Sequence, residues 1–392
     1  MSHPIQYQAP LLRYLARRAE LDLTVFFLSD LSTGAYVDPG FGVPVRWDVS
    51  LLDGYRYIFL PAVGRRDRLS FWRPFVHGLR RHLKAGQFHA LWVHGYAHHA
   101  NLRAIGVARS LGIKVLLRGE SHLHHRARSP LRAWVKDRIL PWLLRRVDGF
   151  LAIGMLNREF YLHYGVPEER IFTMPYAVDN DFFRRQTAEA GPRREKLREE
   201  LGLDPGQPVI LYASKFLKRK RPSDLLDAYV RLSADGAREP APYLLFVGDG
   251  AERPALQARV RVLRWSSVKF LGFKNQTELP RYYDLCDVFV LPSEDEPWGL
   301  VVNEVMNAGK PVIVTDRVGC GPDLVHHGEN GFVVPVGDVE ALARCLRQLT
   351  ADSELARNMG HASQRIISAW DFQADLQGLV QALEYAVGRT AA

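Results

Sequence analysis

The chain has 392 residues, of which 47% are hydrophobic and 24% are charged, so it can form two domains with real cores and is too apolar for extended disorder. Its three cysteines lie far apart, which excludes a disulfide framework or a C-x-x-C zinc site and favours the reducing cytoplasm. The first residues do not predict a signal peptide, and no apolar run approaches the roughly 18 residues of a membrane span.

The net charge of +9 is unevenly divided along the chain. Residues 1–185 hold 27 Lys and Arg against 15 Asp and Glu, a net of +12, which leaves −3 for residues 186–392. This asymmetry predicts either an acidic partner for the first half or a basic surface that is merely well solvated.

Residues 122–146 mix Arg and Lys with Trp, Leu and Ile. The mixture predicts either weak peripheral contact of a cytoplasmic protein with the inner face of the membrane, or a packing helix with a basic outer face. No nucleic-acid motif accompanies the basic residues, so nucleic acid is not an expected partner.

Short apolar runs alternate with helical segments in the first half of the chain. Strands are predicted at residues 23–28, 90–94, 114–117 and 149–153, and helices at residues 71–84, 101–110 and 129–146, the last broken at Pro141. The first residues have the character of a loop that follows a strand. Either the usual first strand is lacking or the start codon lies upstream, and we favour the second.

The same alternation restarts after residue 205. Strands are predicted at residues 208–212, 243–247, 268–271, 287–291 and 311–315, and helices at residues 222–234, 300–308 and 339–350. The pattern predicts two doubly wound α/β domains, at residues 1–180 and 181–368, and a last helix in residues 369–392 that returns to the first domain.

Residues 291–316, LPSEDEPWGLVVNEVMNAGKPVIVTD, carry the strongest motif. Glu296 follows a buried strand, so it is expected at the carboxyl edge of a parallel sheet, where α/β folds bind ligands. Gly299 opens a helix whose free amides suit a phosphate, and Glu304 lies further along that helix. Taken alone, the two glutamates also fit solvated surface carboxylates.

The segment resembles the E-x7-E motif of retaining GT-B glycosyltransferases, the group 1, family 4-like enzymes, and the flanking pattern P-S-x-x-E-P-x-G-L-x-x-x-E-x-x-x-x-G-K-P-V also matches. The resemblance implies the GT-B fold, two Rossmann-like domains facing a cleft. It implies that Glu296 contacts the donor sugar and that Glu304 contacts the ribose hydroxyls. The backbone at Gly299 and Leu300 would face the sugar and the phosphates.

The segment YASKFLKRKRP at residues 212–222 places Lys215 and Lys220 in a loop between a strand and a helix. By the same resemblance, both lysines contact the donor diphosphate. Two cations offset the charge on a leaving diphosphate, so neither a metal nor a cofactor is expected. Without the glutamate motif in register, the basic run would fit a solvated turn.

Weaker matches follow the same order. Gly248 lies in a turn like the family's V-G-x-G, and the segment with Gly272 and Phe273 resembles the one whose backbone meets the nucleobase. Both are also ordinary turns. His94 ends a strand where the family often has a cleft residue, and a buried structural histidine is an equal alternative.

The family usually has another histidine at the end of the next strand, and the equivalent position here is near Gly119. Arg118, Glu120 or His122 would have to take its place.

The resulting prediction is a retaining glycosyltransferase that moves a sugar from a nucleoside diphosphate sugar to a hydroxyl of a saccharide or lipid-linked acceptor, in polysaccharide or glycoconjugate synthesis. Two alternatives remain open at this point. One is a sugar-nucleotide epimerase of the same fold, and the other is a non-catalytic sugar-nucleotide-binding protein.

Overall fold

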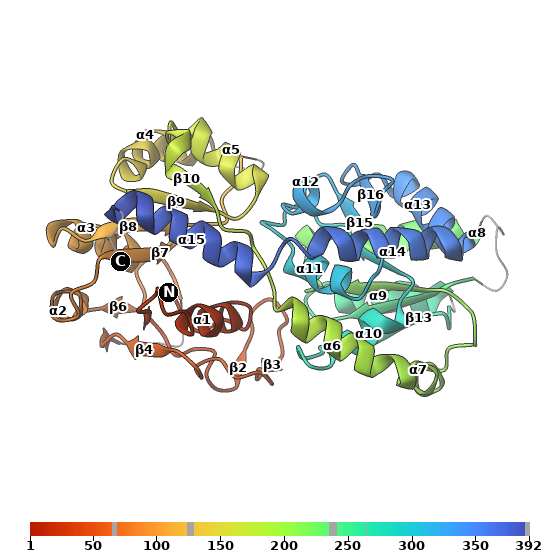
Figure 1. Cartoon of the computed structure of the whole chain (residues 1–392). Coiled ribbons are helices and arrows are strands. Elements are labelled where there is room, and N and C mark those ends of the chain that lie inside the picture. Colours follow the sequence, from red (N-terminus) through yellow and green to blue (C-terminus); the bar gives the residue numbers. More distant parts are fainter. Residues whose placement is uncertain (65–68, 124–128, 235–240, 264, 389–392) are drawn as a thin grey trace. The chain divides into compact units, whose positions relative to one another are not determined.

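The computed structural model describes residues 1–64, 69–123, 129–234, 241–263 and 265–388. The chain forms two compact units, each with a parallel β-sheet and flanking helices (Figure 1). Unit 1 contains Met1–Ala35, Ser50–Ala177 and Asp371–Ala392, and unit 2 contains Tyr36–Val49 and Val178–Trp370. No helix among the described residues has the length and apolar character to cross a membrane.

Unit 1 has a four-stranded parallel sheet in the order β10-β9-β8-β7 and a separate parallel pair, β1-β4. The strands are β1 (Thr24–Phe27), β4 (Arg56–Phe59), β7 (Ala90–His94), β8 (Lys114–Arg118), β9 (Gly149–Ala152) and β10 (Ile171–Thr173), with a small antiparallel pair β5 (Ala62–Val63) and β6 (Phe75–Val76). The strands predicted for this half of the chain are confirmed, and the apolar runs of the central strands β8 and β9 are buried on both faces of the sheet.

Helices cover both faces of this sheet. They are α1 (Gln8–Ala16), α2 (Leu79–Ala85), α3 (His99–Ser110), α4 (Pro130–Leu144), α5 (Met155–His163) and α15 (Phe372–Val387), with the short 3-10 turn η1 (Glu168–Arg170). One core joins α1 and α15 to the sheet through residues such as Leu11, Leu116 and Leu376. A second core packs α2 to α5 against the opposite face.

Two helix predictions in unit 1 are wrong. The helix predicted from residue 71 begins only at Leu79, after Gly78 in a left-handed conformation at φ 82°, and Phe75 pairs in a strand instead. The helix predicted to break at Pro141 continues through it to Leu144. The leucines of this last turn are buried in the core, and the free energy gained by their packing outweighs the cost of the helix hydrogen bond that proline cannot donate. Residues 124–128 of the basic stretch lie outside the described residues.

The last helix is fixed to unit 1 by a buried ion pair. A guanidinium nitrogen of Arg118, at the end of β8, lies 3.1 Å from a carboxylate oxygen of Asp375 in α15, and both side chains are at most 3% exposed. The same nitrogen of Arg118 donates to the backbone carbonyls of Met174 and Pro175. Burial raises the pKa of Asp375 to about 7, and the nearby Arg118 opposes that rise.

Unit 2 has a six-stranded parallel sheet in the order β13-β12-β11-β14-β15-β16. The strands are β11 (Val209–Ala213), β12 (Tyr243–Val247), β13 (Val268–Gly272), β14 (Val288–Leu291), β15 (Val312–Thr315) and β16 (Gly331–Val334), and the strands predicted for this half are confirmed. The helices are α6 (Asn180–Ala190), α7 (Arg194–Leu201), α8 (Pro222–Ala234), α9 (Arg253–Leu263), α10 (Leu279–Leu285), α11 (Leu300–Asn307), α12 (Gly321–Leu324), α13 (Val339–Ala351) and α14 (Ser353–Ile367), with 3-10 turns η2 (Gly191–Arg193) and η3 (Lys218–Lys220).

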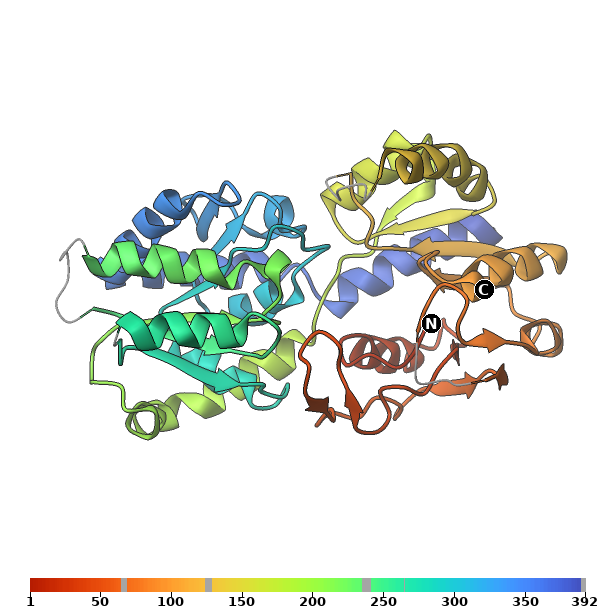
Figure 2. The ribbon, with the colours of Figure 1, turned by 180° about the vertical axis from the view of Figure 1, so that it is seen from behind.

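The helices of unit 2 form two layers around its sheet. A core of α8, α9 and α13 side chains packs on one face, where Figure 2 shows α8 and α9 in front. Helices α10 and α11 contact β11 and β15, and Figure 1 shows them with α6 on the side facing the reader. This doubly wound arrangement confirms the predicted α/β class.

The strand order of unit 2 reverses between β11 and β14. From β11 the chain moves outward to β13, and it then returns beside β11 with β14 and moves in the other direction to β16. The loops after β11 and β14 therefore leave the sheet toward opposite faces. In open α/β sheets, ligands bind at the carboxyl edge at such a switch point.

A small antiparallel hairpin, β2 (Tyr36–Val37) and β3 (Pro44–Val45), also belongs to unit 2, although the sequence placed residues 36–49 within the first domain. The side-chain amide of Asn275 donates to the carbonyl of Arg46 at 2.6 Å. The backbone amide of Thr277 donates to the Asp48 carboxylate at 3.2 Å. These bonds attach the segment to the loop that follows β13.

Candidate functional site

The loops after β11 and β14 are joined at the switch point. The backbone amide of Glu294 donates to the carbonyl of Arg219 at 2.8 Å, and the Arg219 guanidinium donates to the carbonyl of Asp295 at 2.9 Å. Arg221, which links η3 to α8, has an unusual left-handed backbone at φ 48° and forms ion pairs with Asp224 and Glu294. The two predicted motifs therefore form one structure.

Lys220 and Glu296 form an ion pair at the centre of this junction. Their side chains are only 7% and 13% exposed, although each belongs to a loop at the edge of the sheet. Burial, followed by the charges of Arg219 and Lys215, lowers the pKa of Lys220 to about 7, and Asp295 opposes this effect. The Glu296 carboxylate in contact also favours the charged ammonium.

Lys215 is held by a residue that the sequence analysis missed. Its ammonium lies 2.8 Å and 3.0 Å from the two carboxylate oxygens of Asp38, and 4.7 Å from the centre of the Phe41 ring. Burial alone would raise the pKa of Asp38, but hydrogen bonds from Lys215 and from the backbone amides of Phe41 and Gly40 hold it below its usual value. An Asp-x-Gly turn 177 residues before the lysine gave no signal for this contact.

Helix α11 begins at the loop that carries Glu296. Gly299 adopts a left-handed conformation at φ 100°, and a Cβ on it would lie 3.3 Å from the Glu296 side chain, so the turn suits glycine. Leu300 is the first helical residue, and the amides of a first turn have no partner within their helix. The structure thus brings Glu296 to the amino-terminal end of α11.

Glu304 lies deeper than its predicted role suggested. It is 1% exposed on the inner side of α11, and its carboxylate accepts a hydrogen bond from the Tyr283 hydroxyl. The adjacent Asn303 accepts a hydrogen bond from the indole of Trp298 at 3.0 Å. The segment with the two glutamates thus rests on a buried polar layer between α10 and α11, and Tyr283 gave no signal in the sequence.

The predicted glycine turns lie at the neighbouring strand ends. The backbone amide of Gly248 donates to the carbonyl of Gly272 at 2.8 Å, and a Cβ on Gly248 would lie 2.0 Å from the carbonyl oxygen of Ser214. Phe273 lies next to the hairpin, with ring centres 4.9 Å from Phe41 and 6.3 Å from Trp47. These turns therefore lie beside the loop that carries Lys215.

A second loop fixes the position of Glu296. The backbone amide of Gly319 donates to the carbonyl of Glu296 at 2.9 Å, and that of Cys320 donates to the carbonyl of Trp298 at 3.0 Å. A Cβ on Gly319 would lie 2.0 Å from the carbonyl oxygen of Pro297. The sequence analysis missed this contact, because V-G-C-G resembles an ordinary turn.

His94 ends β7 in unit 1 and lines a hollow of about 200 Å³ together with Arg118, Gly119, Glu120 and Tyr176. Burial lowers the pKa of His94 well below its usual value, and the chain's amino terminus and Arg118 act in the same direction. The imidazole is therefore neutral at physiological pH.

Arg118, Glu120 and His122, the candidates to replace the histidine that the family usually has at the end of this strand, lie in different environments. Arg118 is used in the ion pair with α15. Glu120 lines the hollow and accepts a hydrogen bond from the Tyr176 hydroxyl at 2.7 Å. His122 is 3% exposed and is not among the residues that line the hollow. Glu120 is thus the candidate that is best placed to contact a ligand.

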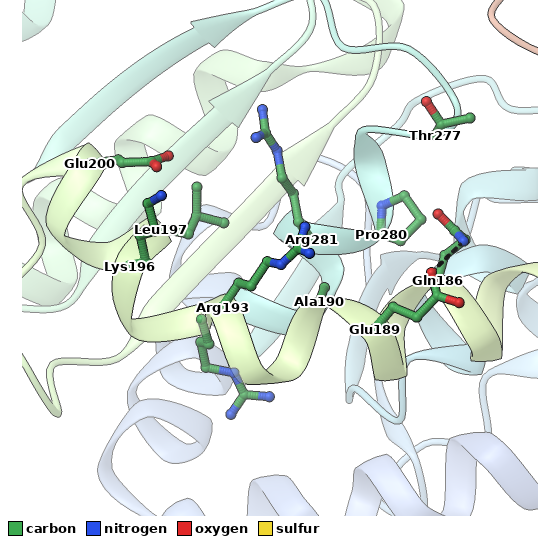
Figure 3. Close-up of a pocket in the computed structure, with 11 residues that line it drawn as sticks. Gln186, Glu189, Ala190, Arg193, Lys196, Leu197, Glu200, Thr277, Pro280 and Arg281 are labelled. Atoms are coloured by element: carbon green, nitrogen blue, oxygen red, sulfur yellow. Dashed lines mark hydrogen bonds between the residues drawn. The ribbon is translucent and has the colours of Figure 1, made fainter.

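Another surface hollow of about 330 Å³ lies between α6, α7 and α10 in unit 2 (Figure 3). Its rim carries Lys196 and Arg281 together with Glu189 and Glu200. None of the residues predicted from the motifs lines it. Within the described parts of the chain, no group of three or more His, Cys, Asp or Glu side chains is arranged to hold a metal ion.

Comparison with solved structures defines the fold. The chain is similar to sucrose-phosphate synthase from Thermosynechococcus elongatus, with a TM-score of 0.67, 23% identity, and coverage of 97% of this chain and 94% of the other. It is also similar to Anabaena HepE in complex with UDP, with a TM-score of 0.72, 18% identity, and coverage of 98% and 100%. The fold is therefore GT-B, as the sequence predicted.

Two family profiles match nearly the whole chain. The profile of the glycosyl transferases group 1 matches residues 193–366, and that of the glycosyl transferase 4-like domain matches residues 5–177. The chain belongs to the group 1, family 4-like glycosyltransferases.

Curated relatives match more restricted regions. N-acetyl-alpha-D-glucosaminyl L-malate synthase of Bacillus anthracis is 31% identical over 212 residues, which cover 54% of this chain and 49% of the relative. The lipopolysaccharide core biosynthesis glycosyltransferase LpsE of Rhizobium meliloti is 35% identical over 160 residues, or 40% of this chain and 44% of the relative. These matches span about half the length of each relative.

Proposed function

We propose that this chain is a retaining glycosyltransferase that transfers a sugar from a nucleoside diphosphate sugar to a hydroxyl of a saccharide or lipid-linked acceptor. The observation that carries the proposal is the Lys220–Glu296 ion pair at the switch point of unit 2, beside the amino-terminal end of α11. A cation, a carboxylate and free helix amides in one place suit the diphosphate and the sugar of such a donor.

The charges of the site support a reaction that needs no metal ion. As the bond to the donor sugar breaks, negative charge develops on the leaving diphosphate. Lys215, Lys220 and the first-turn amides of α11 supply positive charge for that position. In this proposal Lys220 exchanges its contact with Glu296 for one with the diphosphate, which leaves the carboxylate to bind sugar hydroxyls.

The role of Glu296 is to position the donor sugar. After Lys220 has turned to the diphosphate, the backbone of Glu296 is still held by the amide of Gly319, which donates to its carbonyl at 2.9 Å. A fixed carboxylate of this kind suits hydrogen bonds to sugar hydroxyls better than a covalent bond to the sugar. As the resemblance to retaining enzymes implies, we infer that the acceptor attacks on the face from which the diphosphate leaves, with retention of configuration and no covalent bond to Glu296.

The hollow in unit 1 is the proposed acceptor site. The neutral imidazole of His94 accepts or donates a hydrogen bond, and Glu120 accepts one, so both suit a ligand rich in hydroxyl groups. The relatives named above are an N-acetyl-alpha-D-glucosaminyl L-malate synthase and a glycosyltransferase of lipopolysaccharide core biosynthesis. These names support glycoconjugate synthesis as the general process.

The proposal is tested by a calorimetric and thermal-shift screen of UDP, GDP, ADP and their common sugars. We expect saturable binding of one nucleotide, and at least a tenfold loss of affinity in Glu304→Ala, because a charge-assisted hydrogen bond is worth about 1.5–3 kcal/mol. Glu304→Gln removes the charge but keeps the volume of this buried side chain, so it separates the loss of the charge from the loss of packing. Glu199→Ala, on the exposed side of α7, is the matched control.

No binding of any nucleotide to the folded chain would refute the proposal. The bound sugar nucleotide is then incubated alone and with saccharide acceptors, and the products are analysed by NMR. Conversion of the sugar without an acceptor would identify an epimerase instead. Binding without turnover for any acceptor would identify a sugar-nucleotide-binding protein.

Asp38→Asn is expected to strengthen binding of the nucleotide found in the screen by about three- to tenfold. Asp38 competes with the diphosphate for the ammonium of Lys215, whereas asparagine still accepts the amide hydrogen bonds of Gly40 and Phe41. Calorimetry measures the change, with Asp48→Asn in the same segment as the control. Weaker binding in Asp38→Asn would show that the carboxylate positions Lys215 and does not compete for it.

A further inference from the structure

Helix α4 carries large apolar side chains on both its inner and its outer side. Its inner face buries Leu140, Leu143 and Leu144 in the core, each at most 7% exposed. Its outer side exposes Trp134 at 59% and Trp142 at 53%. A helix that only covers a sheet is polar on its outer side, so packing within unit 1 does not explain these tryptophans.

The exposed residues form one continuous stripe. At 100° per residue, the stripe covers an arc of about 140° on the helix, opposite the buried leucines. It consists of Trp134, Val135, Arg138, Ile139 and Trp142 on the helix, continued by Arg145 and the half-buried Arg146 in the turn directly after it. We call this set the α4 stripe.

Positive charge and aromatic rings alternate within the α4 stripe. The Arg138 guanidinium lies 5.6 Å from the centre of the Trp134 ring, and that of Arg146 lies 3.4 Å from the centre of the Trp142 ring. The acidic residue of this part of the helix, Asp137, lies outside the stripe and accepts a hydrogen bond from Tyr164 at 2.6 Å. Between residues 134 and 146, the stripe therefore carries three arginines and no acidic side chain.

This composition decides between the occupants that an exposed apolar face can have. Two copies of the chain that met symmetrically through α4 would bring three arginines toward three arginines with no carboxylate between them, which is unfavourable. An anionic bilayer surface suits the same residues. Indole rings settle at the interface between headgroups and acyl chains, and arginine pairs with lipid phosphates.

We propose that α4 is a membrane-docking helix whose outer stripe lies in the surface of a bilayer that contains anionic lipids. Trp134, Ile139 and Trp142 enter the interface, while Arg138, Arg145 and Arg146 contact the headgroup phosphates. Figure 1 shows α4 beside α5 on the outer side of the sheet of unit 1, and side-chain contacts between the two helices hold α4 in place. The helix is thus already formed before it meets a membrane.

The test is flotation of the full chain with vesicles of phosphatidylcholine alone or with about one third phosphatidylglycerol. We expect binding to the anionic vesicles, little binding to the neutral ones, and release at high salt. Trp134→Ser with Trp142→Ser is expected to weaken binding at least tenfold. Arg138→Glu with Arg145→Glu is expected to weaken it by about fivefold or more per arginine.

The matched control is Trp72→Ser, which removes a tryptophan that is 64% exposed in a different segment of unit 1. This variant is expected to bind vesicles as the wild type does. Because the replaced side chains are exposed, all variants should keep the wild-type melting temperature. Vesicle binding is measured without any nucleotide, so its outcome is independent of the proposed donor site.

Three outcomes would overturn the proposal. The first would be that the wild type fails to float with anionic vesicles at low salt. The second would be that both α4 variants float as well as the wild type does. In the third, sedimentation shows a dimer that the tryptophan variant dissociates, which would assign the stripe to a second copy of the chain.

Discussion

Lys220→Met is expected to reduce turnover by about two to three orders of magnitude and to weaken binding of the nucleotide at least tenfold. Methionine has a similar length and no charge, so the leaving diphosphate loses a cation in a site that is largely shielded from water. Steady-state kinetics and calorimetry measure the two effects. Lys218→Met, in the same 3-10 turn but exposed, is the matched control.

The burial of Lys220 also predicts a pH dependence. Because burial lowers the pKa of this lysine to about 7, the free enzyme loses the ammonium as the pH rises above that value. Affinity for the diphosphate is therefore full below the pKa and falls as the pH rises, by about tenfold or more between pH 7 and pH 9. Lys220→Met should bind weakly with little dependence on pH over this range. Wild-type turnover in Lys220→Met would show that Lys220 is not part of the site that binds the diphosphate.

Gly319→Ala is expected to disrupt the proposed donor site, although Gly319 has no side chain that could contact a ligand. The added methyl group would lie 2.0 Å from the carbonyl oxygen of Pro297 and 3.1 Å from that of Glu296. Both are backbone atoms, so the loop that carries Glu296 must move. We expect the free energy of unfolding to fall by about 1–3 kcal/mol, as in overpacked cores, and nucleotide affinity to fall at least tenfold.

The neighbouring Gly321 provides the control for this steric argument. A Cβ on Gly321 would meet nothing closer than 3.9 Å, and the residue lies two positions further on, at the start of α12. Gly321→Ala should therefore keep wild-type nucleotide affinity in calorimetry and a wild-type midpoint in urea denaturation. If Gly319→Ala also behaves as the wild type does, the loop is more adaptable than its contacts indicate, and Gly319 does not hold Glu296.

The sequence predicted the parts of the site that depend on local order. Glu296, Gly299 and Glu304 were recognised by their resemblance to the family's motif, and the strand, turn and helix around them follow one another as predicted. The same was true of Lys220, which lies between a strand and a helix. The parallel sheet then brings the two loops together at its carboxyl edge, since β11 and β14 are neighbours.

The parts that the sequence missed depend on contacts between distant segments. Asp38 lies far from Lys215 in the chain, and Tyr283 reaches Glu304 from a different helix. Apolar periodicity does not encode such pairings. The error at Pro141 had a related cause, because burial of Leu143 and Leu144 in the tertiary core outweighed the local tendency of proline to end a helix.

The return of α15 to unit 1 has a consequence for synthesis on the ribosome. Unit 1 includes the beginning of the chain, but Asp375, the buried partner of Arg118, leaves the ribosome only after all of unit 2. During translation the sheet of unit 1 lacks α15, and Leu116 and Leu151 lack their cover on that face. By contrast, unit 2 is continuous from Val178 to Trp370, and its other segment, Tyr36–Val49, has already been synthesised by then. The second unit in the sequence can therefore complete its core first, which reverses the usual order of folding from the amino terminus.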